Sequence, residues 1–249
     1  MRKNLLAIFA AMEKVSIELF GLTLLEPSTF VSDVAIAILS LGLYLSLKKL
    51  FPTSDFRKNY GYFFLFLTFG TFTGGNAHLF GNYTDHNLFH ALGWSFSAIS
   101  IYYMQRGSAY DFPDKTKKML YPVFLFQVVV SIMVYFGYQL FGDIQVDHEH
   151  LGTPGFLAVK ISLAIGFIGF ILPLHMIKAL KEKDHGSAIV LMGIVSSVAA
   201  LIIQSKKWGV NIHINHNVVA HMVLAVCYYL YYLGARQKIL KYEGLAEED

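Results

Sequence analysis

Seven long apolar stretches separated by short polar joints constrain this chain more than any other feature of its sequence. A helix needs about 20 mostly apolar residues to cross the hydrocarbon core of a bilayer, because its backbone groups must be hydrogen-bonded internally there. The predicted spans are residues 29–47, 60–80, 88–104, 120–141, 156–177, 188–203 and 214–233. The sequence therefore predicts an all-α membrane protein with a seven-helix transmembrane domain over residues 28–236.

The composition agrees with lipid as the surrounding solvent. Charged residues make up 15% of the chain and hydrophobic residues 55%, whereas a soluble domain carries about a quarter charged residues. The net charge of +3 is small and the basic residues form short clusters, which gives no indication of nucleic-acid binding. The single cysteine, Cys227, lies in an apolar stretch, so this chain alone builds neither a disulfide framework nor a thiolate metal site.

The first 27 residues are predicted to form a separate segment at the membrane interface. Residues 5–25 are apolar overall but contain Glu13, Lys14 and Glu18. Lys14 and Glu18 would lie one turn apart in a helix, which favours an amphipathic helix at the interface. An eighth span is the alternative for this segment.

Lysine and arginine gather in alternate joints, which predicts the orientation in the membrane. The first, third and fifth joints and the tail are basic, whereas the second and fourth joints contain neither residue type. Short cytoplasmic loops carry an excess of these residues, so we expect residues 237–249 to form a cytoplasmic tail and the first span to start on the outer side. Lys206 and Lys207 stand against this assignment but are outnumbered.

With this orientation, the histidines separate unevenly between the two sides. Eight of the ten histidines fall on the outer side, and only His175 and His185 fall opposite. Asp33 lies about one turn into the first span on that same outer side. An ionisable residue within a span costs at least a few kcal/mol, so it usually faces the bundle interior and has a partner there. We therefore expect a polar pocket at the outer ends of the first, second, third and seventh spans.

The start of the seventh span has the most regular pattern. His213, Asn217 and His221 recur at a spacing of four and His216 lies beside them, so all four share one helix face. Imidazoles at such a spacing can share a metal ion. For His213 and His216 the alternative is a hydrogen bond at the level of the lipid headgroups.

The second span ends in His78, which is preceded by the glycines Gly74 and Gly75. Paired glycines let another helix approach closely. We expect them to bring the second and seventh helices together around their histidines. The alternatives without a functional role are a hydrogen bond from His78 to lipid headgroups and, for Asp33, a purely structural bridge between helices.

This pattern resembles the alkaline ceramidase and adiponectin-receptor superfamily of seven-helix membrane hydrolases. The likeness rests on seven spans, on His78 at the end of the second, on polar groups at the start of the third, and on Asn217 and His221 four residues apart in the seventh. It implies a zinc ion bound by three histidines, with His78 and His221 among them. The superfamily's usual histidine is Asn217 here and its usual serine is Gly74, which indicates a divergent branch.

The leading hypothesis is a zinc-dependent membrane hydrolase that acts on a lipid-like amide or ester. Asparagine is a poor zinc ligand, so the third imidazole would come from His216 or His213. Zinc held by His78, His216 and His221 would generate a hydroxide nucleophile. Asp33 or Asp85 would be the base or would orient a ligand, and Asn217 would donate a hydrogen bond to the oxyanion. The remaining candidates for substrate binding are Asn76, His90, Trp94 and His213.

The alternative hypothesis is a non-enzymatic sensor, receptor or transport component that binds a ligand or ion at the same histidines and acids. Histidines there would titrate between about pH 5 and 8 and could change how the helices pack. A b-type haem between His221 and either His78 or His90 is a third possibility. The expected partners are the lipid bilayer and a lipid-like small molecule.

Overall fold

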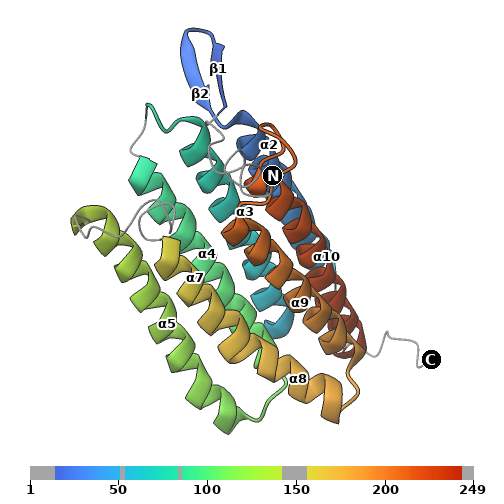
Figure 1. The fold of residues 1–249 in the computed structure, drawn as a ribbon. Coiled ribbons are helices and arrows are strands. Elements are labelled where there is room, and N and C mark those ends of the chain that lie inside the picture. Colours follow the sequence, from blue (N-terminus) through green and yellow to red (C-terminus); the bar gives the residue numbers. More distant parts are fainter. Residues whose placement is uncertain (1–14, 51–53, 84–85, 142–155, 243–249) are drawn as a thin grey trace, which may run out of the picture.

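The computed structural model describes residues 15–50, 54–83, 86–141 and 156–242 of the chain. Within them, seven long helical segments form one bundle (Figure 1), and each corresponds to one predicted span. Their bounds are α2 (Pro27–Lys49), α3 (Asp55–Leu79), α4 (His86–Ser108), α5 (Asp114–Phe141), the continuous α7–η1–α8 (Phe156–Ala164, Ile165–Ile171 and Leu172–Lys181), α9 (His185–Lys206) and α10 (His216–Tyr242). The predicted all-helical bundle is confirmed.

Five of these segments are long and apolar enough to cross a membrane: α2, α5, α7–η1–α8, α9 and α10. Their outward faces are apolar, as shown by Ile38 on α2 and Phe126 on α5, whose side chains are 67% and 70% exposed. Helices α3 and α4 have comparable lengths of 25 and 23 residues but contain more polar residues. These features are those of an integral membrane protein.

The residues before α2 differ from the predicted amphipathic or eighth helix. Residues 16–25 form an antiparallel hairpin of β1 (Ser16–Leu19) and β2 (Leu22–Leu25), which stands at one end of the bundle (Figure 1). Its two turn residues, Phe20 and Gly21, have φ angles of 51° and 77°, as a two-residue hairpin turn of the primed type requires. The prediction of a helix is therefore wrong for residues 16–25, and residues 1–14 lie outside the described part.

The helix ends follow from local sequence. Pro27 starts α2, where its missing N–H costs nothing. The Ser54 hydroxyl accepts the backbone N–H of Arg57 at the start of α3, and the Asp184 carboxylate accepts that of Ser187 at the start of α9. These caps fix where α3 and α9 begin at the end of the bundle opposite the hairpin.

Aromatic side chains fill the bundle centre, where α3, α9 and α10 meet. Tyr60, Phe63 and Phe64 of α3 are buried there, and the Phe63 ring lies 6.0 Å from that of Tyr231 on α10. Gly193 of α9 makes room, because a Cβ atom at this position would lie only 2.6 Å from the Tyr231 ring. Close packing of α9 on α10 thus depends on a residue without a side chain.

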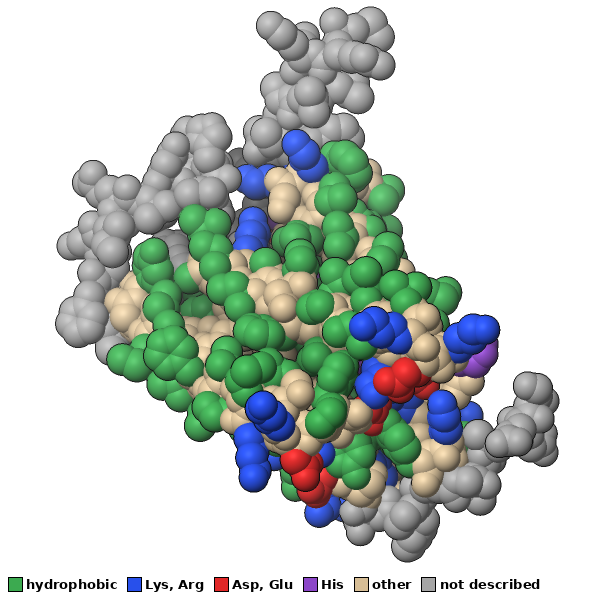
Figure 2. All heavy atoms as spheres, turned by 90° about the horizontal axis from the view of Figure 1, so that it is seen from below, with side chains coloured by type: hydrophobic (Ala, Val, Ile, Leu, Met, Phe, Trp, Pro, Cys, Tyr) green, Lys and Arg blue, Asp and Glu red, His purple; other side chains and the backbone are tan. Residues whose placement is uncertain are grey.

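The last helix extends beyond its predicted end. Helix α10 continues to Tyr242, so residues 237–242 of the predicted cytoplasmic tail are helical. The side chain of Lys238 in this stretch is buried within the bundle. Residues 243–249 lie outside the described part. Figure 2 views this end of the molecule and shows lysine, arginine and acidic side chains among apolar ones.

Candidate functional site

The start of α2, the end of α3 and the start of α10 meet at the hairpin end of the bundle (Figure 1). Predicted site residues Asp33, His78, His216 and His221 come from these three helices, and Glu26 lies directly before α2. We call these five residues the hairpin-end cluster. Direct contacts and electrostatic interactions connect all five, so the predicted gathering of polar residues is present in the structure.

One pair in the cluster joins the start of α2 to the end of α3. The Nδ1 atom of His78 lies 2.6 Å from Oε2 of Glu26. Glu26 adopts a left-handed backbone with φ of 44° immediately before Pro27. The ring of His90 on α4 lies edge-on to His78 at 5.2 Å, and Trp94 stacks on His90 at 5.3 Å. A row of rings therefore leads from the cluster into α4.

The second pair joins α2 to α10. The Ser32 hydroxyl lies 2.8 Å from the Thr29 carbonyl oxygen and 2.8 Å from Nδ1 of His221. A hydroxyl has one proton, which Ser32 donates to the carbonyl, so we assign Nδ1 of His221 as the donor to Ser32. The Nε2 atom of neutral His221 then carries a lone pair, and it lies 3.5 Å from Oδ1 of Asp33.

The charges of the cluster act on one another. Asp33 lies within electrostatic range of His78 and Glu26, and His221 lies within range of His78 and His216. The side chains of Asp33 and His221 are only 8% and 15% exposed. With neutral imidazoles the five residues carry two negative charges, one on each carboxylate. Two protons or one divalent cation would neutralise this partly buried charge, which apolar surroundings favour.

The paired glycines before His78 do allow another helix to approach closely. The helix that packs against Gly75 is α2, however, and not the predicted α10. A Cβ atom on Gly75 would lie 2.8 Å from Cβ of Asp33 on α2, rather than against α10. A Cβ atom on Gly93 of α4 would lie 3.2 Å from the backbone nitrogen of Gly74. The glycines therefore seat α3 between α2 and α4, and the expectation that they bring α3 onto α10 is corrected.

The other predicted site residues lie in or around this region. Asn217 is buried, and its Oδ1 accepts a hydrogen bond from Gln204 at 2.8 Å. The Asn76 amide donates to the Phe72 carbonyl of its own helix at 2.7 Å. His213 is exposed in the segment before α10. Asp85 lies outside the described residues.

The zinc ligands that the resemblance implies do not converge on one point. Across residues 15–50, 54–83, 86–141 and 156–242, no group of three or more His, Cys, Asp or Glu side chains could hold a metal ion. The reason is visible in the two pairs: Glu26 holds His78, whereas Ser32 holds His221 almost two turns further along α2. His78, His216 and His221 as placed therefore do not fit a three-histidine zinc site.

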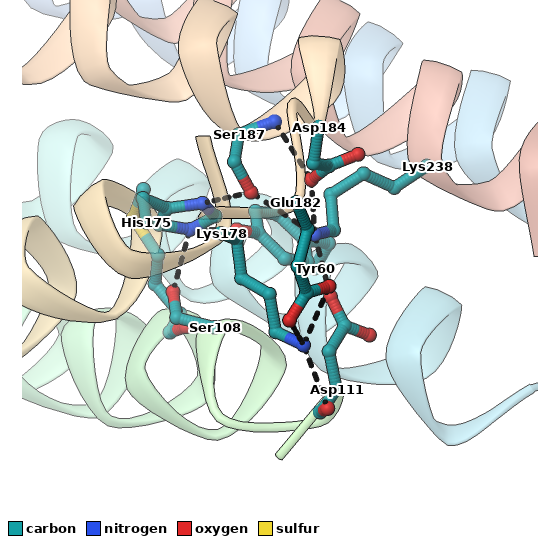
Figure 3. A network of polar contacts seen from close by, with 10 residues as sticks. Tyr60, Ser108, Asp111, His175, Lys178, Glu182, Asp184, Ser187 and Lys238 are labelled. Atoms are coloured by element: carbon teal, nitrogen blue, oxygen red, sulfur yellow. Dashed lines mark hydrogen bonds and ion pairs between the residues drawn. The ribbon is translucent and has the colours of Figure 1, made fainter. Parts of the chain in front are cut away.

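Sequence reasoning missed a second polar network at the opposite end of the bundle (Figure 3). Lys238 of α10 lies 2.5 Å from Oδ2 of Asp111 and 2.7 Å from Oδ2 of Asp184. We call these three residues the Lys238 triad. Asp111 lies in the turn before α5 and Asp184 in the turn before α9, so one lysine ties two interhelical turns to α10.

The ring of His175 extends this network into the bundle. Its Nδ1 atom lies 3.0 Å from the Ser187 hydroxyl, and its Nε2 atom lies 3.0 Å from both the Tyr60 and the Ser108 hydroxyls (Figure 3). The available signal was His175 within an apolar stretch on the side opposite most of the histidines, together with Asp184 and Lys238 at the ends of apolar stretches. In the sequence pattern, Lys238 is one of the basic residues of the predicted cytoplasmic tail and indicates only the orientation.

Comparison with known proteins adds a family assignment but no activity. A search of curated proteins and a search of solved structures each find no match. One family model, described as a family of unknown function (DUF6962), matches residues 28–240. This range spans the bundle from the start of α2 to near the end of α10. The chain therefore belongs to this family of unknown function, DUF6962.

Proposed function

We propose that this chain is a seven-span membrane protein in which the hairpin-end cluster binds protons or another cation, as part of a sensor, receptor or transport component. Five helices meet the length and hydropathy expected of spans, and α3 and α4 pack among them with similar lengths. The alternation of basic joints supports a cytoplasmic C-terminus and an outer location for the hairpin end.

The observation that carries this proposal is that two imidazole–carboxylate pairs bind α2 to different neighbours. Glu26 and His78 connect α2 with α3, while Asp33 and His221 connect α2 with α10. An ion pair between two helices holds them together only while its two groups carry opposite charges. A proton shared by Asp33 and His221 attracts the two helices, whereas its loss leaves a carboxylate facing a lone pair at 3.5 Å. Cation binding is thereby linked to the packing of α2.

A second candidate is the zinc-dependent hydrolase acting on a lipid-like amide or ester. One observation favours it: His78 and His221 each engage Nδ1 with an oxygen acceptor on or beside α2, as histidines that bind metal through Nε2 commonly do. As placed, these side chains do not form a three-ligand group, so this function requires a different arrangement of the cluster.

The first test uses Trp94 as a reporter, because its ring stacks on His90, which contacts His78. The Trp208→Phe variant leaves Trp94 as the sole tryptophan. In full-length protein purified in detergent, we expect Trp94 emission to change with a midpoint between about pH 5 and 8. His78→Gln should alter this titration, whereas His213→Gln, which changes an exposed histidine, should not. A flat emission profile that His78→Gln leaves unchanged contradicts the proposal.

The two candidate functions separate in a parallel assay with zinc chloride and with lipid amides and esters. The ion-binding function predicts no fatty-acid release above that of the Asp33→Asn variant. Zinc-dependent release that is lost in His221→Gln but retained in His213→Gln would establish the hydrolase instead. Equilibrium dialysis measures bound zinc in the same samples and shows whether the cation reaches the cluster at all.

A further inference from the structure

A pocket of about 390 Å³ lies at the bundle end opposite the hairpin, far along the helices from the hairpin-end cluster. It is formed by the turn before α5, the turn before α9 and the end of α10. Its lining includes three carboxylates, three lysines and three aromatic rings. A volume of this size lies within the range of sites for small molecules, which is about 300–1,000 Å³.

The deep part of this pocket carries more negative than positive charge. Lys238 is shared between Asp111 and Asp184, so one ammonium group faces two carboxylates. All three side chains are at most 9% exposed. The nearby Lys178 donates a hydrogen bond to the backbone carbonyl of Asp111 at 3.0 Å, but its charge is matched by Glu182, whose two carboxylate oxygens it contacts at 2.8 and 3.0 Å. One negative charge thus remains uncompensated among buried groups, which is costly without a further partner.

Within this excess of carboxylates, one oxygen atom stands out by its lack of a hydrogen-bond partner among the described residues. Oδ2 of Asp111 contacts Lys238, but Oδ1 is buried and, among the described residues, has no hydrogen-bond partner. The Asp111 side chain is 8% exposed and belongs to the pocket lining. Buried carboxylate oxygens are normally hydrogen-bonded, so this atom indicates a missing donor.

The exposed part of the lining has the opposite net charge, because Lys178 matches the 54% exposed Glu182 and Lys241 adds a further positive charge. Lys241 lies one turn beyond Lys238 on α10, lines the pocket and is exposed. Tyr242 beside it is 45% exposed, and Tyr110 and Phe112 add two more rings to the lining. The pocket therefore has a negative floor, aromatic walls and a positive rim.

We propose that this pocket binds a zwitterion with a primary ammonium group and a phosphate group, the chemistry of phosphoethanolamine. The ammonium donates a hydrogen bond to Oδ1 of Asp111, and the phosphate faces Lys241. A proton or a metal ion on Asp111 would satisfy the same oxygen but would use neither the volume of the pocket nor the lysine at its rim. The source of the zwitterion is a lipid headgroup or a free small molecule.

The test is calorimetric titration of the full-length protein in detergent with phosphoethanolamine, ethanolamine and phosphocholine. Phosphoethanolamine should bind at least about tenfold more tightly than phosphocholine, because the trimethylated nitrogen has no N–H to donate and a hydrogen bond to a charged group contributes about 1.5–3 kcal/mol. This comparison needs no variant. Equal affinity for the two compounds, or no binding of either, overturns the proposal.

Two variants test the two ends of the zwitterion separately. Asp111→Asn should weaken phosphoethanolamine and ethanolamine alike by about tenfold or more, whereas Asp114→Asn, which changes an exposed aspartate nearby, should weaken neither. Lys241→Ala should weaken phosphoethanolamine roughly twofold to fivefold, as expected for an exposed charge, and leave ethanolamine unchanged. Folded Asp111→Asn protein with unaltered affinities contradicts the proposed contact.

Nanodiscs identify the source of the zwitterion. If the occupant is a lipid headgroup, discs of phosphatidylethanolamine should abolish the titration with free phosphoethanolamine, whereas discs of phosphatidylcholine should preserve it. If the occupant is a free molecule, the titration survives in both. A thermal stabilisation by potassium chloride that ethanolamine does not reproduce would show an inorganic cation at Asp111 and overturn the proposal.

Discussion

Nε2 of His221 and Oδ1 of Asp33 face each other at 3.5 Å across the interface of α2 and α10. Because Ser32 holds the opposite ring nitrogen at 2.8 Å, the His221 ring cannot turn away from Asp33 without breaking a hydrogen bond. Two groups that can both accept protons are thus held together in a largely buried position between the helices. The proposed cation sensitivity of the contact between α2 and α10 rests on this relationship.

The close packing of Asp33 against α3 can be tested by substitution of two adjacent glycines of α3, Gly74 and Gly75. Gly75→Ala would place a Cβ atom 2.8 Å from Cβ of Asp33, and overpacking of this kind costs about 1–3 kcal/mol. Gly74→Ala is the matched control, since its Cβ atom would have no heavy atom within 4 Å among those described. Thermal unfolding in detergent should show a lower midpoint for Gly75→Ala only. Equal midpoints would mean that α2 and α3 are less closely packed than described.

The Lys238 triad should be critical for stability. Lys238→Met leaves the buried carboxylates of Asp111 and Asp184 without their shared cation, and breaking a buried ion pair in this way costs about 3–5 kcal/mol. Lys241→Met, one turn later at an exposed position, should change stability by less than about 0.5 kcal/mol. Denaturant titration followed by helical circular dichroism measures both. Similar losses for the two variants would place Lys238 at the surface.

Acid should weaken the same triad. Burial raises the pKa of Asp184, but its hydrogen bonds with Lys238 and Ser187 outweigh burial and hold this pKa below its ordinary value of 3.8. The charged form is therefore favoured in the folded state, and its contribution is fully present above about pH 4 and is lost as the pH falls through the lower folded pKa.

Asp184→Asn isolates this contribution, because asparagine keeps the helix cap while it removes the charge. The difference in thermal midpoint between the natural protein and Asp184→Asn should be large at pH 6 and shrink towards pH 3. Asp55→Asn is a suitable control, since Asp55 forms an exposed pair with Lys58. A difference that does not vary with pH would show that Asp184 acts only as a cap.

The bundle was predictable from sequence because a span has a simple physical requirement, a long run of apolar residues, and each such run became a helix. It was also predictable that Asp33 and His221 face partners inside the bundle, since ionisable residues within apolar runs need such partners. Glu26 was not recognised as the partner of His78, because the two are joined only when the start of α2 packs against the end of α3.

Other features depended on three-dimensional contacts that the hydrophobic pattern of the sequence does not reveal. Residues 16–25 are apolar enough for a helix, yet Phe20 and Gly21 adopt positive φ angles and reverse the chain into a hairpin. Lys238 resembles any lysine at the end of a span, and its burial follows from the approach of the turns that carry Asp111 and Asp184. In both cases contacts between distant segments outweighed local composition.

The most direct test of the proposed cation binding at the hairpin-end cluster is the ¹⁵N spectrum of the histidine rings in full-length protein in nanodiscs, recorded from pH 5 to 8. His221→Gln assigns the His221 signals, and Asp33→Asn removes the carboxylate that faces Nε2. We predict that Nε2 of His221 changes from a bare acceptor to a proton-sharing nitrogen as the pH falls, and that Asp33→Asn abolishes this change. An Nε2 signal that stays constant across this range, identical in Asp33→Asn, would contradict the proposal.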